Sequence, residues 1–142
     1  MEIADVRRRV RAAIDAARKS ARERRERSDR AAAEYEAFLR DRAIPLIHVF
    51  ASALVAEGHR FKVFTPSESV RLAAESSPED FIEIALDPTL DPPAVVGRVS
   101  RGRGRRSIAS ERPINADVSI ADLTDDDLMA FLISEIPPFV ER

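Results

Sequence analysis

The sequence predicts an α+β fold with four parts: a long N-terminal helix (a coiled-coil or helical arm), a second helix, a five-stranded antiparallel meander sheet and a C-terminal helix. Three observations predict it. Residues 2–42 contain neither Gly nor Pro and are rich in Ala, Arg and Glu, which favour helix. Residues 59–112 hold five short apolar segments separated by turn residues. Residues 124–138 have helical spacing between a Thr start and a Pro-Pro stop.

The chain divides into a long charged helix, residues 1–42, and a compact α+β domain, residues 43–142. Apolar residues in the first half of the helix follow heptad spacing: Ile3, Val6, Val10, Ala13 and Ala17. A second register continues through Ala21, Ser28, Tyr35 and Phe38. Such a helix is about 60 Å long, more than one small core can cover. We therefore expect an arm that pairs with another chain; the alternative is a solvated helix held by pairs such as Glu23 and Arg27.

The second helix is expected to follow a break or kink at Pro45 and to end at Gly58. Its apolar stripe comprises Ile47, Phe50 and Leu54. The expected strands lie within residues 59–66, 69–76, 81–86, 94–100 and 107–112, with a turn at 76–80. In the third strand, Ile82 and Ile84 share one face and Glu83 points outward.

The C-terminal helix has a specific start signal. Thr124 is a good N-cap residue, and Asp127 stands three positions later, as in a capping box. The expected buried face comprises Leu128, Phe131, Leu132 and Ile136. Pro137 and Pro138 end the helix.

Composition limits the classes of function. The chain has no cysteine, which excludes disulfides, cysteine nucleophiles and thiolate metal sites. No apolar run approaches the roughly 20 residues of a membrane span, and the N-terminal stretch lacks the apolar core of a signal peptide. We therefore expect a cytoplasmic protein without membrane contact. The 21 Arg against 2 Lys, with abundant Ala, are typical of a GC-rich bacterial genome.

Catalytic and cofactor motifs are missing from the sequence. His48 and His59 are the only histidines and have no metal-site spacing. No serine lies in a G-x-S-x-G context, and no glycine-rich phosphate loop precedes a helix. Helix capping explains the Asp triplet at 125–127. We expect no enzyme activity, no cofactor and no metal site.

Charge is distributed in blocks although the net charge is only −2. Residues 1–42 carry a net charge of +4, residues 43–97 of −5, residues 98–112 of +5 and residues 113–142 of −6. A basic segment therefore lies between two acidic ones. Its arginines are the candidate anion- or partner-binding residues: Arg98, Arg101, Arg103, Arg105 and Arg106.

These arginines are expected to lie on a β-hairpin. A two-residue turn at Arg103–Gly104 pairs Val99 with Ile108 and places Arg101 opposite Arg106. Like charges facing each other destabilise a strand pair, so this register predicts an anion nearby. The anion is a carboxylate of this chain or of a second copy, an acidic partner protein, or the phosphate backbone of a nucleic acid.

These features lead to two main hypotheses. The first is a non-enzymatic cytoplasmic interaction protein, an adaptor, chaperone or assembly subunit, that forms a homo-oligomer, most simply a dimer, and contacts a protein partner. The alternative is a nucleic-acid-binding dimer that uses the arginine hairpin 98–106 and the basic N-terminal helix. A small enzyme or ligand-binding domain is a third hypothesis, with little in the sequence to support it.

Overall fold

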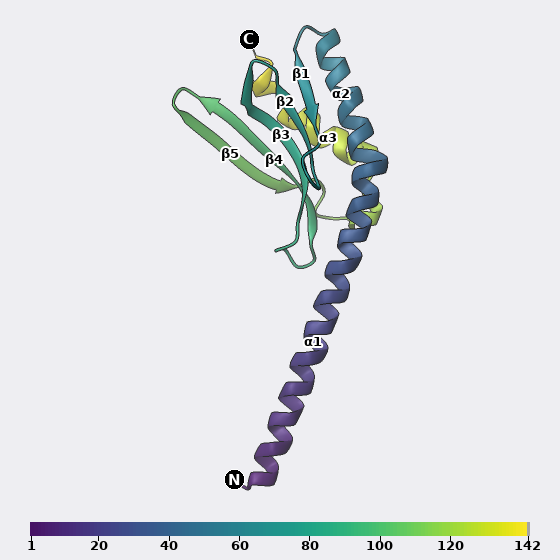
Figure 1. Cartoon of the computed structure of the whole chain (residues 1–142), viewed down its shortest axis with the longest axis vertical. Coiled ribbons are helices and arrows are strands. Elements are labelled where there is room, and N and C mark those ends of the chain that lie inside the picture. Colours follow the sequence, from purple (N-terminus) through teal and green to yellow (C-terminus); the bar gives the residue numbers. More distant parts are fainter. Residues whose placement is uncertain (142) are drawn as a thin grey trace.

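One continuous helical rod and a five-stranded sheet dominate the structure, a computed structural model that describes residues 1–141 (Figure 1). The fold is α+β, as predicted. The rod consists of α1 (Ile3–Phe38), a π-helical segment (Leu39–Ala43) and α2 (Ile44–Ala56). The strands are β1 (Phe61–Phe64), β2 (Val70–Ala74), β3 (Ser77–Asp87), β4 (Ala94–Arg103) and β5 (Arg106–Pro113). The helix α3 (Asp125–Glu135) follows, between the short 3-10 turns Ile120–Asp122 and Pro137–Phe139.

The expected break at Pro45 is wrong, because the second helix is merged with the first. Proline lacks an N–H, and its ring collides with the carbonyl four residues earlier, here that of Asp41. The structure accommodates this with a wider π-helical turn just before Pro45, in which the Ile44 N–H donates to the Leu39 carbonyl, five residues back. The rod therefore runs unbroken from residue 3 to residue 56.

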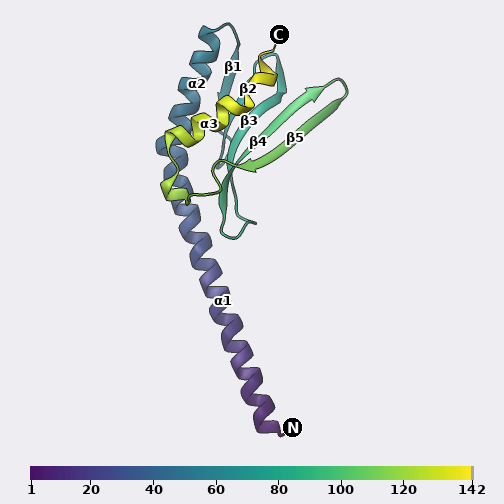
Figure 2. The same cartoon turned by 180° about the vertical axis from the view of Figure 1, so that it is seen from behind.

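The sheet is the predicted antiparallel meander, with strand order β1-β2-β3-β4-β5. Ile84 of β3 lies between Val70 of β2 and Gly97 of β4, so the three share one face. Helix α3 crosses this face (Figure 2), and α2 runs beside β1 and β2. The core between sheet and helices includes Leu72, Ile82, Val99, Phe131 and Leu132.

The rod joins this core only in its second half. Ala31, Tyr35 and Phe38 are buried with the sheet and α3, and the Tyr35 hydroxyl donates to the Glu68 carbonyl at 2.5 Å. Burial raises the pKa of the Tyr35 phenol above its ordinary value. Before Ala31, every residue is exposed except Asp5 and Ala21, which are half-buried. The N-terminal part of α1 therefore projects from the domain as a bare helix (Figure 1).

The expected turn at 76–80 is wrong for most of its length. The chain turns at Glu75–Ser76, and β3 already begins at Ser77. Pro78 is compatible with extended backbone near the start of a strand. The β2–β3 register shifts between Ala73 and Ala74, and this irregularity takes up the unmatched residues.

The start of α3 confirms the predicted capping box. The Thr124 hydroxyl accepts a hydrogen bond from the Asp127 N–H at 3.1 Å, and the Asp127 carboxylate accepts one from the Thr124 N–H at 3.0 Å. The predicted buried face of the helix is also confirmed, since Leu128, Phe131 and Leu132 are buried. Within residues 1–141, no helix has the length and apolar character needed to cross a membrane.

Candidate functional site

The arginine hairpin forms, but its turn lies one residue later than predicted. The turn residues are Gly104 and Arg105, and Arg103 lies opposite Arg106. Gly104 has φ +64°, and as the first central residue of the turn it fits a type II′ hairpin. The opposed arginines are therefore Arg103 and Arg106, next to the turn, whereas Arg101 lies opposite Ile108.

An ion pair accounts for the observed register. It places Arg98 opposite Glu111, and the Arg98 Nε donates to Glu111 Oε1 at 2.6 Å. The predicted register placed Arg98 opposite Ala109 and left this carboxylate elsewhere. The apolar pair Val99–Ile108 that favoured the predicted register does not form, because Val99 faces Ser110.

Arg98 belongs to a ladder of charges that crosses four strands on the face opposite α3. Its Nη1 lies 3.7 Å from Glu83 Oε1, and the Nε of Arg71 donates to Glu83 Oε2 at 2.7 Å. The hydrogen bond to Glu111, with the charges of Glu111 and Glu83, raises the pKa of the Arg98 guanidinium. The ladder thus consists of Arg71, Glu83, Arg98 and Glu111, and Arg98 is already satisfied within the chain.

Glu83 is the unexpected member of this charge ladder. It lies on the face opposite Ile82 and Ile84, as predicted, but its side chain is only 8% exposed. Two guanidinium groups enclose it, and Arg71 also stacks 4.0 Å from the centre of the Phe81 ring. Sequence alternation gives the face of Glu83 but not its cross-strand neighbours, so its burial was not predicted.

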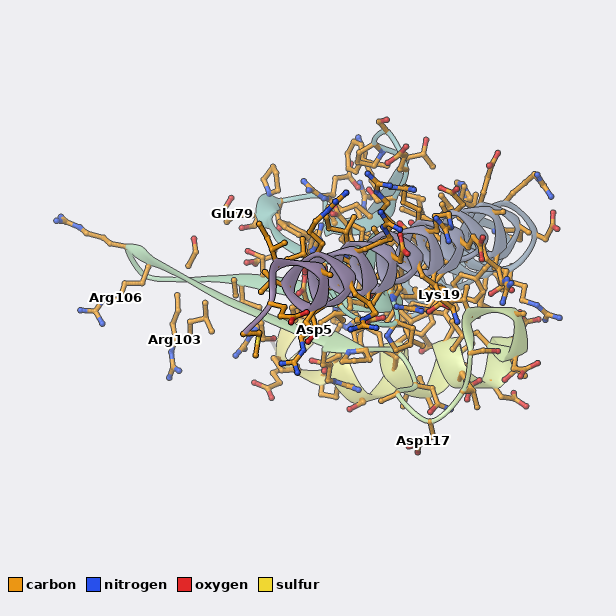
Figure 3. The ribbon with its side chains drawn as sticks, turned by 90° about the horizontal axis from the view of Figure 1, so that it is seen from below. Asp5, Lys19, Glu79, Arg103, Arg106 and Asp117 are labelled. Carbon is orange, nitrogen blue, oxygen red and sulfur yellow. The ribbon has the colours of Figure 1, made fainter. Side chains whose placement is uncertain are left out.

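The other four arginines of the hairpin form a separate group, the arginine tip: Arg101, Arg103, Arg105 and Arg106. Within residues 1–141, none of them forms an ion pair. Arg103 and Arg106 lie at the projecting end of the hairpin (Figure 3). The described part of the chain therefore does not supply the anion that the opposed arginines predict.

A groove of about 920 Å³ lies beside the turn end of the hairpin, between Arg101–Arg103 of β4, the start of β1, the β2–β3 turn and the C-terminal turn. Its charged lining includes His59, Arg60, Arg101 and Arg103 but also Glu75, Asp80 and Glu141. The Asp80 carboxylate accepts a hydrogen bond from the Gly102 N–H at 2.6 Å. Because both signs of charge line it, the groove does not select one class of ion. In residues 1–141, no three His, Cys, Asp or Glu side chains are grouped as metal ligands.

A second uncovered surface is the apolar stripe of α1. Its large members are Ile3, Val6, Val10 and Ile14, whose exposed fractions are 80%, 42%, 50% and 44%. Heptad spacing alone selects Ala13 and misses Ile14, which a spacing of four from Val10 would have found. The stripe continues into Ala21, which lines a small cavity together with Leu90 of the β3–β4 loop, and Arg27 pairs with Asp91 of this loop at 3.4 Å.

Two surfaces thus stand out as candidates for binding: the arginine tip and the apolar stripe of α1. Arg103, Arg105, Arg106 and the large residues of the stripe are exposed, and Arg101 is half-buried. The five predicted site residues divide between the charge ladder and the arginine tip. Arg98 is held in the ladder by Glu83 and Glu111, and the other four form the tip. Neither a family model nor a curated protein nor a solved structure matches the chain.

Proposed function

We propose that this is a non-enzymatic interaction protein of the cytoplasm, an adaptor, chaperone or assembly subunit, that self-associates through the apolar stripe of α1. The observation that carries the proposal is the exposure of Val6, Val10 and Ile14 on a helix that projects from its own domain. Isolated helices gain little stability in water from propensity alone, and an amphipathic helix is stabilised mainly when its apolar side is covered. A second copy presents an identical stripe, so it can cover the first.

The heptad spacing supports a helix as the covering element. Ile3, Val6, Val10 and Ala13 repeat with the spacing that brings two helices together side by side. The same side of the helix faces the β3–β4 loop nearer the domain, where Ala21 and Leu90 line one cavity. Association through residues 3–17 would cover the part of the stripe that lies beyond this loop.

Light scattering on the full chain in moderate salt tests this proposal. We expect the wild type to have the mass of a dimer or larger assembly, and we expect Val10→Asp combined with Ile14→Asp to lower that mass, because the charges are incompatible with a buried seam. Val49→Asp is the matched control, since Val49 is 64% exposed on the same rod but lies outside the stripe. A wild type that is monomeric at every concentration would contradict the proposal.

A second function, nucleic-acid binding, is favoured by one observation: the arginine tip has no ion-pair partner within residues 1–141. A two-stranded ribbon with arginines at its end can enter a groove of duplex DNA and contact phosphates. The exposed arginines of α1, such as Arg22 and Arg25, would add to the basic surface in a dimer.

Titration of duplex and single-stranded DNA at two salt concentrations tests this second function. Binding should weaken steeply with salt, by roughly one power of the salt concentration for each phosphate neutralised. Arg103→Glu with Arg106→Glu should abolish binding, and Arg40→Glu, far from the tip, should leave most of it. No affinity of the wild type at low salt would eliminate nucleic acid as the partner.

A further inference from the structure

The outer edge of β5 is a free sheet edge. β5 is the last strand in the sheet order, and all its residues except Pro113 are exposed. No other element lies beside this edge in either view (Figures 1 and 2). A strand of this kind carries a row of backbone N–H and C=O groups that can bond to another strand.

The hairpin register identifies which backbone groups are free. The Ile114 N–H donates to the Val95 carbonyl at 3.0 Å, which marks these two residues as a hydrogen-bonded pair. Hydrogen-bonded pairs alternate along an antiparallel ladder, so the even-numbered residues of β5 bond to β4. The backbone groups of Ser107, Ala109 and Glu111 therefore point away from the sheet.

Natural sheets usually protect such an edge with charges, prolines or bulges, and β5 has only the charges of Arg106, Glu111 and Arg112. It has no bulge against β4, no lysine, and no proline before Pro113 at its end. Its most apolar side chain, Ile108, is 42% exposed on the same face as Val99 and Val95. The backbone groups of this edge can therefore bond to another strand.

We propose that β5 pairs antiparallel with β5 of a second copy, about a two-fold axis at Ile108, so that two sheets become one sheet of ten strands. In this register Ile108 faces Ile108 of the other copy, and Ser107 faces Ala109, whose backbone groups are free to bond. Arg105, in the turn before β5, then lies opposite Glu111 of the other copy, whose Oε1 accepts a hydrogen bond from Arg98, so the two arginines share this carboxylate. The Glu111 carboxylate of the second copy would thus be an anion close to the arginine tip, which forms no ion pair within residues 1–141.

The charges select this register over its neighbour. An axis at Ala109 would place Arg106 opposite Arg112 of the other copy twice, and like charges directly opposed destabilise a strand pair. The axis at Ile108 instead pairs Arg106 with Ser110. It also places the two isoleucines at a position without hydrogen bonds, where side chains approach most closely.

The β5 interface is separate from the stripe of α1, so it does not depend on the proposed function. Each interface joins two copies by a two-fold axis, and each can form without the other. If both form, one chain can contact two other copies, and the assembly grows beyond a dimer.

Cysteine cross-linking tests the β5 pairing, because the chain has no cysteine of its own. Under mild oxidation, Ile108→Cys should give a disulfide-linked dimer, since residues at the axis come within disulfide distance. Ala109→Cys is the control. In this register residue 109 faces residue 107 of the other copy, so the two cysteines are offset by two residues along the strands and lie too far apart for a disulfide. Absence of a cross-link at position 108 in the folded protein, or a cross-link at 109 in its place, would overturn the proposal.

A proline substitution tests the same edge by mass. The Ala109 N–H points away from β4, so Ala109→Pro removes no hydrogen bond within the chain but blocks pairing at the edge. The substitution is made in the Val10→Asp, Ile14→Asp chain, where the stripe of α1 is disabled. We expect this chain to remain a dimer, Ala109→Val to keep the dimer, and Ala109→Pro to reduce it to a folded monomer. A dimer that survives Ala109→Pro, or a stripe-disabled chain that is already monomeric, would overturn the β5 proposal and leave the α1 proposal to its own test.

Discussion

At the scale of single residues, Gly97 shows how closely sheet and helix approach. A Cβ built on Gly97 would overlap the ring of Phe131, which packs on β4 from α3. Nothing in the sequence distinguishes this glycine from the other three, because its role depends on a residue 34 positions later. The contact fixes the distance between α3 and the centre of the sheet.

Gly97→Ala should therefore lower the free energy of unfolding by about 1–3 kcal/mol, the usual cost of overpacking a core. Gly102→Ala is the matched control: its Cβ would meet the flexible side chain of Glu79 at 3.2 Å and Asp80 Oδ1 at an ordinary 3.5 Å, so we expect little change. Adding Phe131→Leu should recover part of the loss, because it removes the ring that the new methyl meets. Denaturant unfolding measures all three, and equal effects at the two glycines would contradict the packing described.

Thr124 is the second residue whose role is local and specific. Its hydroxyl satisfies the Asp127 N–H at the start of α3. Thr124→Ala should cost about 1 kcal/mol of stability, the typical loss of an N-cap. Ser52→Ala, at an exposed position within α2, should change stability by less than about 0.5 kcal/mol, and a similar loss at both sites would argue against the cap.

Asp127 makes the stability contributed by this helix cap depend on pH. Hydrogen bonds from the Thr124 backbone N–H and the Asn115 side chain lower the pKa of the Asp127 carboxyl. A lowered pKa in the folded state contributes stability above the unfolded-state pKa, about 3.9, and this contribution is lost as the pH falls through the folded-state pKa. The stability difference between wild type and Asp127→Asn should thus be constant near neutral pH and shrink in acid. A difference that grows in acid would contradict this sign.

At the scale of elements, the charge ladder holds β2, β3, β4 and β5 together on the face of the sheet opposite α3. Glu83 is its central member because it accepts hydrogen bonds from Arg71 and faces Arg98 at 3.7 Å. Glu83→Gln should lower stability by about 1–2 kcal/mol, toward the low end for a charged hydrogen bond because both arginines are partly exposed to water.

The matched control for the ladder is Glu75→Gln. Glu75 pairs with Lys62 at 3.7 Å, and both side chains are well exposed. Exposed pairs contribute little, so this substitution should change stability by less than about 0.5 kcal/mol. If both glutamates gave the same small effect in denaturant unfolding, the ladder would not be a structural element.

Most helices and strands were predictable from the sequence, because they depend on local periodicity. The strands centred on Val63, Leu72 and Ile84 follow from alternation, and the capped start of α3 follows from Thr124 and Asp127. The turn of the arginine hairpin was missed by one residue, because a glycine fits either central position and only the Arg98–Glu111 pair decides between them. The unbroken rod was missed because a single proline allows either a break or a π-helical turn.

The candidate site was predictable only in part, for the same reason. The sequence identifies the five arginines and the first residues of the stripe of α1. It does not show that Arg98 is enclosed by Glu83 and Glu111 from other strands, or that the other four arginines form no ion pair within residues 1–141. Such facts depend on cross-strand neighbours, and these are set by the register.

At the scale of the whole molecule, the long bare part of α1 is the dominant feature. The core includes Ala31, Tyr35 and Phe38 of α1 but no residue before Ala31, and Arg27 pairs with Asp91 of the β3–β4 loop. An apolar stripe on a projecting helix is stabilised by a partner, and a second copy has the matching stripe. The opposite end of the molecule offers the β5 edge, so copies can meet at two distant places.

The most direct test of the central claim, that α1 pairs with another copy, is amide hydrogen exchange of α1 as a function of protein concentration. A helix end that stands alone opens readily, so its amides exchange fast at every concentration. We predict that residues 5–28 become slower to exchange as concentration rises, and that Val10→Asp with Ile14→Asp abolishes this dependence while residues 31–56 stay protected. Fast exchange of residues 5–28 in the wild type, unchanged across concentrations, would contradict self-association through α1.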